Sequence, residues 1–527
     1  RQNNLFCAVL LLALICHEVE SATILALFSS LSYTDHIVFR AYISLLAQKG
    51  HSMIVMTPYP GYFSYPETEK IVELDVGQAS APYWDEYKKF ITNTDDYHPR
   101  LKAFNEFALK LAIAQLKSKQ MMALLINPNL RFDLVITEAD VPLLYAVAEK
   151  YEAPHISITA STGKIHQHES KGDPVQPILF TDVNTLNHGD LMSNWDKIIE
   201  LYRHVLTKYD YYYNYLPLCE MAAKKLLGLR RPLQEVEYDI DLLFIANNPY
   251  LVGNRPVGPA VVFVDRMHIR PRLRLPQHLQ ISLDSATNGA VYFSLGAIQE
   301  SEELSASILQ TLAEAFRELP FTVLWKIGNT TKFDKPENVI AQTWFPQQEV
   351  LAHPNVKAFI THGGPRSLEE TVFYTVPIIG FPNIKSRKVF LAEVTKFGAG
   401  EILNPYKLNK EKVKETISAV VTNIKYKKGI DFMKYTIYEP LVSNPDNAVW
   451  WTEYLLRHKS AKHLHAPVVG LTLIRYYLIN ILLYMYILIL LVLYLSILMI
   501  RATIRRLKVR IARRQVVAAP GTKFKAL

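Results

Sequence analysis

Short apolar runs of strand type alternate with helical stretches in both halves of the chain, and this alternation constrains the fold more than any other feature. The runs read ATILALF, SMIVMT, FDLVIT and HISITA in the first half, and AVYFSL, FTVLWKI, VIAQTW, VKAFIT and VPIIGF in the second. Strands separated by helices predict parallel sheets covered by helices. We therefore predict two doubly wound α/β domains that face one another, with ligands at the carboxyl ends of the strands.

The segment between the two halves sets the predicted domain boundary. LLFIANN is interpreted as the last strand of the first domain, and NPYLVGNRPVGPAV, which is rich in Pro, Gly and Asn, as the linker. The predicted domains are residues 23–245 and 246–460. Between residues 160 and 235 the pattern is helical and aromatic.

One strand-loop-helix unit in residues 344–382 carries the strongest chemical signal. VKAFI predicts a strand, THGGP interrupts it with two glycines, and SLEETVFY predicts a helix that opens with Ser367. The N-terminus of that helix presents unpaired N–H groups and the positive end of its dipole, which favour a diphosphate. His362 adds a donor and Trp344 a flat face for a base. Taken singly, Ser367 with Glu370 is a capping box and a Trp is a core residue, but their joint spacing favours a nucleotide site.

These residues make the segment resemble the signature of the UDP-glycosyltransferases, which move sugars from UDP-sugars to small lipophilic acceptors, and the insect membrane-bound members in particular. The likeness extends to ATILALFSSLSYTDHIVFRAYISLLAQKGHSMIVMTP near the start, GAVYFSLGAIQESEEL in the middle and PDNAVWWTEYLLRH near the end. It implies two facing Rossmann-like domains of GT-B type. The first would bind the acceptor and the second the UDP-sugar, and a single transmembrane helix would follow.

The resemblance also implies roles for donor-binding residues. They are Trp344 and Gln347 for uracil, Glu370 for the ribose hydroxyls, His362, Gly364 and Ser367 for the diphosphate, and Ser294 and Gly296 for an approach to the phosphates from another strand end. Fixed dipoles and His362 would then do the work of a metal ion. We expect no metal and no cofactor besides the UDP-sugar co-substrate, although Asp239-Ile240-Asp241 reads as a D-x-D pattern.

The catalytic base is the point at which this sequence departs from the insect pattern. Those members carry a catalytic His in S-H-Q-V-V-F-R, and aligning the V-F-R at residues 38–40 places Asp35 at that position, with His36 next to it. On a helix a one-residue offset swings a side chain by roughly 100°. An Asp with a pKa near ~3.9 is a weak base toward a hydroxyl. Thr34 or Asp35 is alternatively a helix N-cap.

Further positions matter to the implied mechanism. The partner carboxylate of the base falls at Glu138, with Asp140 as a second candidate. The positions that depart from the family pattern are Ser386 and Arg387 in place of a sugar-binding Asp-Gln pair, Thr375 in place of a Gly, and Asp265-Arg266 in place of a Gly-Gly.

Two hypotheses follow from these departures. In the first, the chain is a hexosyltransferase that inverts the sugar without a metal and donates glucose or glucuronate, with Lys385 and Arg387 favouring the acidic sugar and His36 reaching the acceptor through a shifted loop. In the second, it is a catalytically impaired UDP-binding member that acts as a membrane partner subunit. The sequence leaves the identity of the acceptor undecided, and residues 202–215 either line its pocket or form an exposed helix. It also leaves undecided whether the chain forms a homo-oligomer.

Charge and cysteine content exclude other classes of protein. Of the 58 Lys and Arg residues, nine lie in residues 501–527, which contain no acid, so 49 remain against 49 Asp and Glu. This balance disfavours nucleic-acid binding. Cys7 and Cys16 fall in the segment read as a signal peptide, and Cys219 is then the one cysteine left, which disfavours a disulfide-stapled receptor ectodomain.

Two apolar segments predict targeting to the endoplasmic reticulum membrane. LFCAVLLLALIC indicates a signal peptide over residues 1–22. Residues 476–500 form an apolar run long enough to span a bilayer. Residues 501–527 then form a basic cytoplasmic tail, which would leave the catalytic part in the lumen with the sequon at residues 329–331 available for glycosylation. Detoxification is the process that the family resemblance implies.

Overall fold

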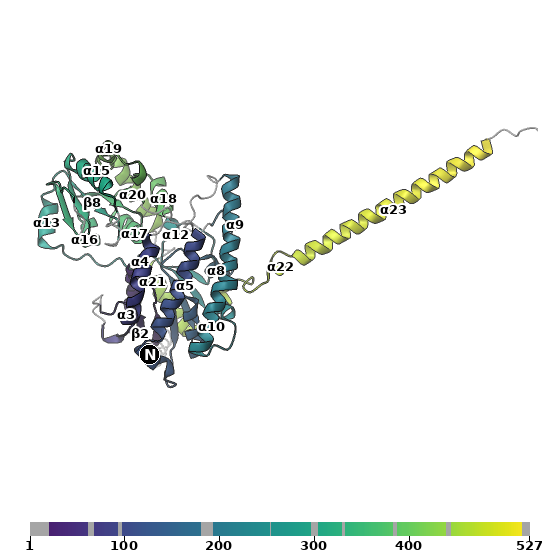
Figure 1. Ribbon diagram of the computed structural model, residues 1–527, viewed down its shortest axis with the longest axis horizontal. Helices are drawn as coiled ribbons and strands as arrows, with labels where there is room; N and C mark the ends of the chain where they lie inside the picture. The colour runs from purple at the N-terminus through teal and green to yellow at the C-terminus, as the bar shows by residue number, and fades with distance from the viewer. Residues whose placement is uncertain are drawn as a thin grey trace, which may run out of the picture. The chain divides into compact units, whose positions relative to one another are not determined.

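The computed structural model describes residues 21–61, 68–92, 97–180, 193–252, 255–296, 304–328, 333–382, 387–438 and 444–518. The predicted signal peptide, the sequon and the end of the basic tail lie outside these ranges. The chain divides into two compact units, residues 1–467 and 468–527. The first unit contains two parallel sheets, each with its own helices (Figure 1).

The first sheet has seven strands in the order β3-β2-β1-β4-β5-β6-β7, and all described pairs are parallel. Its strands are β1 (Thr23–Leu27), β2 (Ser52–Thr57), β3 (Ile71–Asp75), β4 (Leu134–Glu138), β5 (His155–Thr159), β6 (Leu242–Ile245) and β7 (Val261–Phe263). The helices between them are α2 (Tyr33–Gln48), α3 (Gly77–Ser80), α4 (Trp84–Thr92), α5 (Tyr97–Leu116), α6 (Lys119–Ile126), α7 (Tyr145–Tyr151), α8 (Ile165–Glu169), α9 (Asn194–Asp210), α10 (Leu216–Leu227), α11 (Leu233–Tyr238) and α12 (Pro249–Val252). A π-turn, Tyr211–Tyr215, joins α9 to α10.

The second sheet has six parallel strands in the order β10-β9-β8-β11-β12-β13. They are β8 (Ala290–Ser294), β9 (Thr322–Lys326), β10 (Val339–Gln342), β11 (Val356–Thr361), β12 (Ile378–Gly380) and β13 (Gly400–Ile402). Its helices are α13 (Gln277–Asp284), α15 (Ala306–Arg317), α16 (Gln347–Leu351), α17 (Pro365–Tyr374), α18 (Arg387–Lys396), α19 (Lys410–Thr422) and α20 (Ile424–Ile437).

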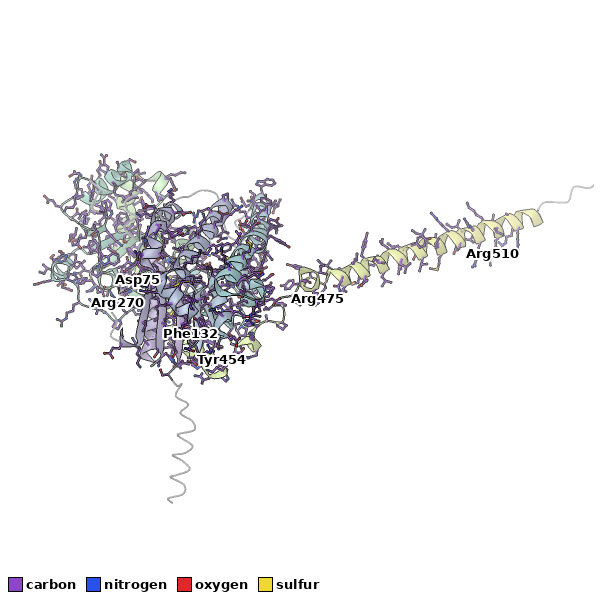
Figure 2. All side chains as sticks on the ribbon, turned by 60° about the horizontal axis from the view of Figure 1, so that its bottom comes forward. Asp75, Phe132, Arg270, Tyr454, Arg475 and Arg510 are labelled. Atoms are coloured by element: carbon purple, nitrogen blue, oxygen red, sulfur yellow. The ribbon has the colours of Figure 1, made fainter. Side chains whose placement is uncertain are left out.

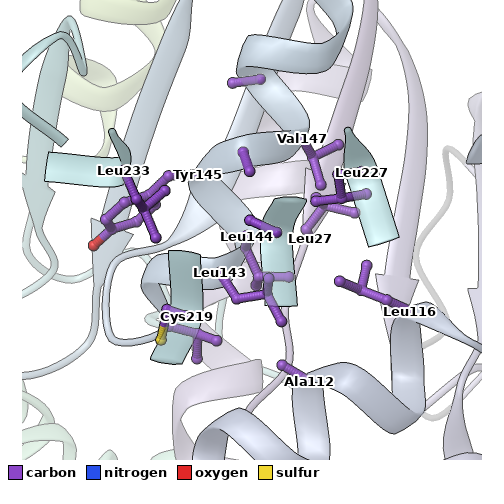
Figure 3. Close-up of a cluster of buried hydrophobic side chains, with 14 of the residues drawn as sticks. Leu27, Ala112, Leu116, Leu143, Leu144, Tyr145, Val147, Cys219, Leu227 and Leu233 are labelled. Atoms are coloured by element: carbon purple, nitrogen blue, oxygen red, sulfur yellow. The ribbon is translucent and has the colours of Figure 1, made fainter. Parts of the chain in front are cut away.

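The burial of the central strands explains why apolar runs in the sequence predicted the positions of the strands. Every residue of β4, β5 and β8 is buried, as expected for parallel strands covered by helices on both faces. The side chains on one face of the first sheet pack with α5, α7 and α10, and this cluster includes the buried free thiol of Cys219 (Figure 3). All nine runs named from the sequence correspond to strands.

The observed limits of the second domain differ from the predicted ones at both ends. β6 is not the last strand of the first sheet, because β7 pairs with it in parallel, so residue 246 falls inside the first domain and the linker follows β7. Helix α21 (Pro445–His458) also returns to the first sheet. Its Ala448 and Leu455 pack with Ile24 and Phe39, and the hydroxyls of Tyr42 and Thr452 lie 2.6 Å apart.

The second unit consists of α22 (Leu473–Tyr476) and α23 (Ile479–Ala518). Leu478, with a φ of 53°, separates the two helices. Side chains project from all sides of α23, with Arg510 in its far half (Figure 2). By length and composition, Ile479–Arg514 is one helix that could cross a membrane, with a mean hydropathy of 2.8 in its most apolar window. It starts three residues later than the predicted 476–500 and continues into the basic residues.

Candidate functional site

The loop after β11 brings backbone and a histidine close together at one edge of the second sheet. Thr361 at the end of β11 pairs in register with Ser294 at the end of β8. Gly363 has a φ of 88°, and a Cβ there would lie 2.7 Å from Leu391. A Cβ on Gly364 would lie 2.6 Å from Nε2 of His362, so the buried imidazole sits against this backbone. Both glycines are therefore required for the close approach.

Helix α17 starts earlier than the sequence indicated. It begins at Pro365 with Gly364 as N-cap, and glycine has no side chain with which to cap the helix. Pro is favoured at the first helical position because its φ is already suited to a helix. The predicted opening at Ser367 is therefore wrong, and so is the alternative reading of Ser367 with Glu370 as a capping box. The Ser367 hydroxyl instead accepts a hydrogen bond from Nε2 of Gln347 at 3.1 Å.

Glu370 is the centre of a polar network under α17. Its two carboxylate oxygens accept hydrogen bonds from Nε2 of Gln347 at 2.5 Å and from Nε2 of Gln348 at 3.0 Å. Burial raises the pKa of Glu370 to about 7. The sequence prediction joined Gln347, Ser367 and Glu370, and the structure brings all three together, while Gln348 was not predicted.

Trp344 stands at the rim of this network. It is 53% exposed, which leaves much of the indole accessible. Nζ of Lys326 lies 4.4 Å from the centre of its ring, and the ring of Tyr33 in α2 meets it edge-on at 6.4 Å. Lys326 also donates to the carbonyl of Gly296 at 2.7 Å, so the glycine turn after β8 lies close to the same rim.

Ser294 and Gly296 form a small turn at the end of β8. Ser294 is buried, and its hydroxyl accepts the N–H of Gly296 at 3.3 Å. Gly296 has a φ of 99°, which a residue with a Cβ rarely adopts. The structure thus places both residues beside the His362 loop, at the carboxyl edge predicted from the sequence.

Arg366, which the sequence analysis did not select, links the two domains. One of its terminal nitrogens donates to Glu369 at 3.0 Å. The other donates to the carbonyls of Ala160 and Ala246 and to Oδ1 of Asn247, the last at 2.6 Å. These acceptors lie just beyond β5 and β6 of the first sheet. A cation in the first turn of a helix opposes the dipole, and that conflict was the signal available in the sequence.

His36 faces the interior of the first domain. Only 3% of it is exposed. Its Nε2–H donates to the carbonyl of Ser30 at 2.7 Å, and Thr57 lies 3.4 Å from Nδ1. Burial lowers the pKa of His36 to about 4. The imidazole is thus neutral and fully engaged within its own domain, so this geometry gives no support to its prediction as a catalytic residue.

Asp35, one residue earlier, lies partly exposed in the first turn of α2. Burial raises its pKa to about 6, Asp140 raises it further, and Ser32 and Arg366 oppose the rise. Arg366 belongs to α17, so Asp35 interacts with a charge of the second domain. The N-cap of α2 is Ser32, whose hydroxyl accepts the N–H of Asp35. The alternative that Thr34 or Asp35 is the cap is therefore wrong, because the helix begins earlier.

Glu138 and Asp140 follow β4 at the same edge. One oxygen of Glu138 accepts the N–H groups of Ser29 and Ser30, each at 2.8 Å. Burial and then Asp140 raise the pKa of Glu138 to about 8. Glu138 therefore holds the loop backbone: the N–H of Ser30 donates to Glu138, while the carbonyl of Ser30 accepts from His36.

Asp140 pairs with Nζ of Lys164 at 3.2 Å and accepts the hydroxyl of Thr159 at 2.9 Å. Burial raises its pKa, but Lys164 and Thr159 outweigh this effect and hold the pKa of Asp140 below its ordinary value. Asp140 thus stays charged near Asp35.

The domain linker carries a buried charge cluster beside Glu370. His268 lies 3.5 Å from Glu369 and 3.6 Å from Glu370. Burial and the charge of Arg366 lower the pKa of His268 to about 3. Burial raises the pKa of Glu369 to about 7. The neutral imidazole therefore lies between the carboxyl groups of Glu369 and Glu370 on α17.

Two of the positions at which the family pattern has glycine adopt left-handed backbone here. Thr375, the C-cap of α17, has a φ of 55°, and Arg266 has a φ of 56°. Nζ of Lys427 donates to the Thr375 carbonyl at 2.7 Å. The Arg266 side chain bonds Asp265 at 3.1 Å and lies 4.4 Å from the centre of the Tyr438 ring. The chain keeps the glycine-type backbone and stabilises it with side chains.

The remaining predicted positions are placed as follows. Ser386 lies outside the described residues, and Arg387 begins α18 with its side chain outside them. Asp239 pairs with Arg231 and Lys462, while Asp241 accepts the N–H of Ala461 at 2.7 Å. The D-x-D pattern thus anchors the C-terminal part of the first unit. Of the aromatic residues 202–215, Tyr211 and Tyr212 line a pocket, while Tyr202, Tyr209 and Tyr213 are exposed.

Sequence comparison finds relatives along most of the chain. The sequence model described as UDP-glucoronosyl and UDP-glucosyl transferase matches residues 23–515. The chain is 28% identical over 446 residues to UDP-glycosyltransferase UGT5 of Dactylopius coccus, covering 83% of this chain and 84% of that protein. It is 27% identical to the ecdysteroid UDP-glucosyltransferase of Spodoptera littoralis nuclear polyhedrosis virus, covering 87% and 93%. UDP-glucuronosyltransferase 2B17 of Mus musculus is 25% identical, covering 83% and 85%.

Solved structures share the two-domain architecture. The calicheamicin glycosyltransferase CalG4 superposes with a TM-score of 0.53 at 18% identity, covering 83% of this chain and 99% of CalG4. Glycosyltransferase VinC in complex with DTDP gives a TM-score of 0.55 at 13% identity, covering 83% and 100%. At such identity the likeness concerns the fold, and it confirms the predicted pair of Rossmann-like domains of GT-B type.

Proposed function

Because this chain belongs to the UDP-glucoronosyl and UDP-glucosyl transferase family, we propose that it transfers glucose or glucuronate from a UDP-sugar to a hydroxyl of a small lipophilic acceptor, with inversion and without a metal. One observation carries the proposal: Arg366, in the first turn of α17, donates hydrogen bonds to Ala160, Ala246 and Asn247 just beyond β5 and β6. The carboxyl edge of the acceptor domain therefore lies against the helix terminus suited to the donor diphosphate.

In the proposed reaction Asp35 takes the proton of the acceptor hydroxyl. The acceptor oxygen attacks C1 of the sugar, the bond between C1 and the diphosphate oxygen breaks, and UDP leaves with the electron pair. Attack on the face opposite the leaving group inverts the configuration at C1. A pKa raised to about 6 makes Asp35 a stronger base than an ordinary aspartate and leaves it ionised at neutral pH.

The leaving diphosphate would be stabilised by the N-terminus of α17. Unpaired N–H groups after Gly364 and the helix dipole supply partial positive charge there. His362 adds a donor, and Arg366 adds a full positive charge. We propose that uracil stacks on Trp344 and bonds Gln347, and that the ribose hydroxyls donate to Glu370. Arg387, at the start of α18, would contact the sugar and favour glucuronate.

The proposal is tested with the full chain reconstituted in lipid nanodiscs. Calorimetry measures UDP binding, and radiolabelled UDP-glucose and UDP-glucuronate measure transfer to 4-nitrophenol. Glu370→Ala should weaken UDP binding by at least about tenfold, since it removes two charged hydrogen bonds to ribose. Glu415→Ala, on the exposed face of α19, is the matched control and should bind as the parent does.

The outcomes separate the two hypotheses for this family member. Folded protein with no affinity for UDP would overturn the donor site. UDP binding without transfer from either sugar nucleotide to a broad set of phenols would support the second hypothesis, a non-catalytic membrane partner.

We further propose that α23 anchors the chain in the endoplasmic reticulum membrane, with the catalytic unit in the lumen. Support comes from the basic residues that follow the apolar half of α23, since cytoplasmic flanks are enriched in Lys and Arg. Protease treatment of sealed microsomes should spare residues 23–467 and cut only the tail. Loss of the catalytic unit in sealed vesicles would reverse the orientation.

A further inference from the structure

Helix α9 carries a row of exposed apolar residues at an outer edge of the first domain (Figure 1). Each of these residues is between 51% and 68% exposed. They recur at spacings of three and four positions, so they share one face of the helix. The members of this row, called the α9 stripe below, are Trp195, Ile198, Leu201, Tyr202, Val205 and Tyr209.

The other side of α9 attaches the helix to the domain. Glu200 and Asp210 are buried there. Lys208 forms an ion pair with Glu169 of α8, and the hydroxyl of Tyr212 donates to the same carboxylate at 3.2 Å. A single exposed apolar residue needs no explanation, but six on one face of a helix indicate an interaction surface.

Exposed apolar residues continue beyond the stripe into the π-turn and α10. Tyr213 is 71% exposed, Leu218 41% and Met221 60%. Lys224 and Lys225 follow on α10 and are also exposed. Trp and Tyr rings beside lysines are typical of segments that lie in the interface of a bilayer, where the rings sit at the level of the headgroups and the lysines reach lipid phosphates.

The chain leaves the first unit close to α8, the helix that holds α9. Shortly before the unit ends at Pro467, Nε2–H of His465 donates to the carbonyl of Asp241 at 3.1 Å. The carbonyl of the preceding residue, Ile240, accepts a hydrogen bond from Nζ of Lys171, which lies just beyond the end of α8. A short series of contacts therefore joins the exit of the chain to α9.

The connection from this exit to the proposed membrane anchor is short. Residues 468–472 alone lie between the first unit and α22. Five residues extend at most about 18 Å, so a chain anchored by α23 would keep the first unit near the bilayer surface. A short tether raises the effective concentration of lipid at such a surface, so that even a weakly binding apolar face docks.

A second copy of the chain is a weaker explanation for the stripe. Residues 195, 198, 202, 205 and 209 follow the spacing of a coiled coil, but they cover only about two heptads. A stable coiled coil needs about three to four heptads. The length of the stripe therefore favours lipid as the occupant.

We propose that the α9 stripe lies in the headgroup region of the same membrane that α23 spans, so that the chain meets the bilayer at two places. Trp195 and Ile198 enter the boundary between headgroups and acyl chains, and Lys225 faces lipid phosphates. This contact holds the first domain in one orientation relative to the bilayer. The inference rests on the proposed anchoring by α23.

The test places nitroxide labels on the full chain in nanodiscs of palmitoyl-oleoyl phosphatidylcholine. Ile198→Cys carries the label on the stripe, and Phe432→Cys, at a residue of α20 that is 60% exposed, is the matched control. Both variants also carry Cys7→Ser and Cys16→Ser, while the thiol of Cys219 is buried. Power-saturation EPR measures collisions of each label with oxygen, which concentrates in lipid, and with a water-soluble nickel chelate.

The ratio of oxygen to nickel collisions should be about fivefold higher at Ile198→Cys than at Phe432→Cys, because the polar chelate is excluded from apolar surroundings. Equal ratios at the two labels would overturn the inference. A label at Ile198→Cys that is shielded from both reagents would indicate a second copy on the stripe and would also overturn it.

A third label separates the stripe from the anchor on which the inference rests. Leu493→Cys, in the apolar half of α23, should collide with oxygen far more than with the chelate. If Leu493→Cys behaves so while Ile198→Cys resembles the control, the anchor stands and the stripe inference fails. If the chelate reaches Leu493→Cys freely, the proposed anchoring itself fails.

The native Trp195 gives a second measurement without any cysteine substitution. In nanodiscs of brominated phosphatidylcholine, the lipid should quench most of the emission that Trp195→Phe removes from the parent. The same comparison in unbrominated lipid is the control. Emission from Trp195 that bromination leaves unchanged would contradict the inference even if a labelled variant folded poorly.

Discussion

Replacement of Asp35 by Asn should abolish most sugar transfer while it leaves the donor site intact. The substitution keeps the shape of the side chain but removes its capacity to accept a proton. A positioned general base contributes roughly 10²- to 10⁴-fold, equivalent to about 3 to 5 kcal/mol in the barrier. Since Asp35 lies on α2 and the Glu370 network lies on α17, the Kd for UDP should change by less than about twofold.

The pH profile gives a sharper measure of the same group. A pKa of about 6 means that roughly nine tenths of Asp35 is ionised at pH 7 but only about one tenth at pH 5. The kcat at saturating UDP-sugar should therefore rise about tenfold per pH unit up to 6 and level off above it. Saturation with the donor removes any contribution from Glu370 to binding, so the slope reports the base.

Controls and contrary outcomes are well defined for Asp35. Asp284→Asn, on an exposed turn end of α13, should leave kcat and its pH profile unchanged. His36→Gln should lower kcat far less than Asp35→Asn, because the imidazole is occupied by the Ser30 carbonyl. A kcat that is flat from pH 5 to 8, or an Asp35→Asn variant that retains more than a tenth of the parent activity, would refute the assignment.

Three further predictions concern α17. Arg366→Ala breaks a largely buried pair with Glu369 and three bonds to the first domain, so it should cost about 3–5 kcal/mol and lower the unfolding temperature, with Arg366→Lys in between. Thr375→Gly should raise the free energy of unfolding by about 1 kcal/mol, since the left-handed φ of 55° strains a β-branched residue. Denaturant titration measures this change. A loss of stability would show that the contact of Thr375 with Lys427 outweighs the strain. Ionisation of Glu370, whose pKa is about 7, should make UDP-glucose bind more tightly at pH 8 than at pH 6, and Glu370→Gln should remove that dependence, as calorimetry can measure.

The sheets could be predicted from sequence because parallel strands are buried on both faces. Runs such as LVITE in β4 and AVYFS in β8 have every residue buried, and their residues are mostly apolar, with the strongly polar ones confined to the carboxyl ends of the strands. The short β7, VVF, was overlooked because three residues within a segment rich in Pro and Gly carry little signal. Its pairing with β6 is what moved the domain boundary.

Helix starts were predicted less well because they depend on local capping choices. α2 begins at Tyr33 with Ser32 as cap, and α17 begins at Pro365 with Gly364 as cap. In each case several residues near the start could serve as the cap, and the geometry of the preceding loop decides. The register of α2 is what turns His36 inward and leaves Asp35 at the edge of the site.

Long-range partners account for the part of the site that the sequence did not reveal. The resemblance assigned Gln347 and Glu370 to one donor site, and the structure joins them by a hydrogen bond. The contacts of Arg366 with Ala160 and Ala246, by contrast, join residues more than a hundred positions apart and in different domains. Such pairs arise only when both sheets are in place, so no local pattern predicts them.

The length of α23 has a consequence for the boundary between lipid and water. A continuous helix of 40 residues extends about 60 Å, twice the ~30 Å of hydrocarbon in a bilayer. If α23 spans the bilayer as proposed, its apolar half, which lies first along the chain, would fill the lipid, and the arginine-bearing half would extend beyond the lipid tails. The guanidinium groups nearest the lipid would then meet phospholipid headgroups, and the rest of the helix would present positive charge in the water beyond them.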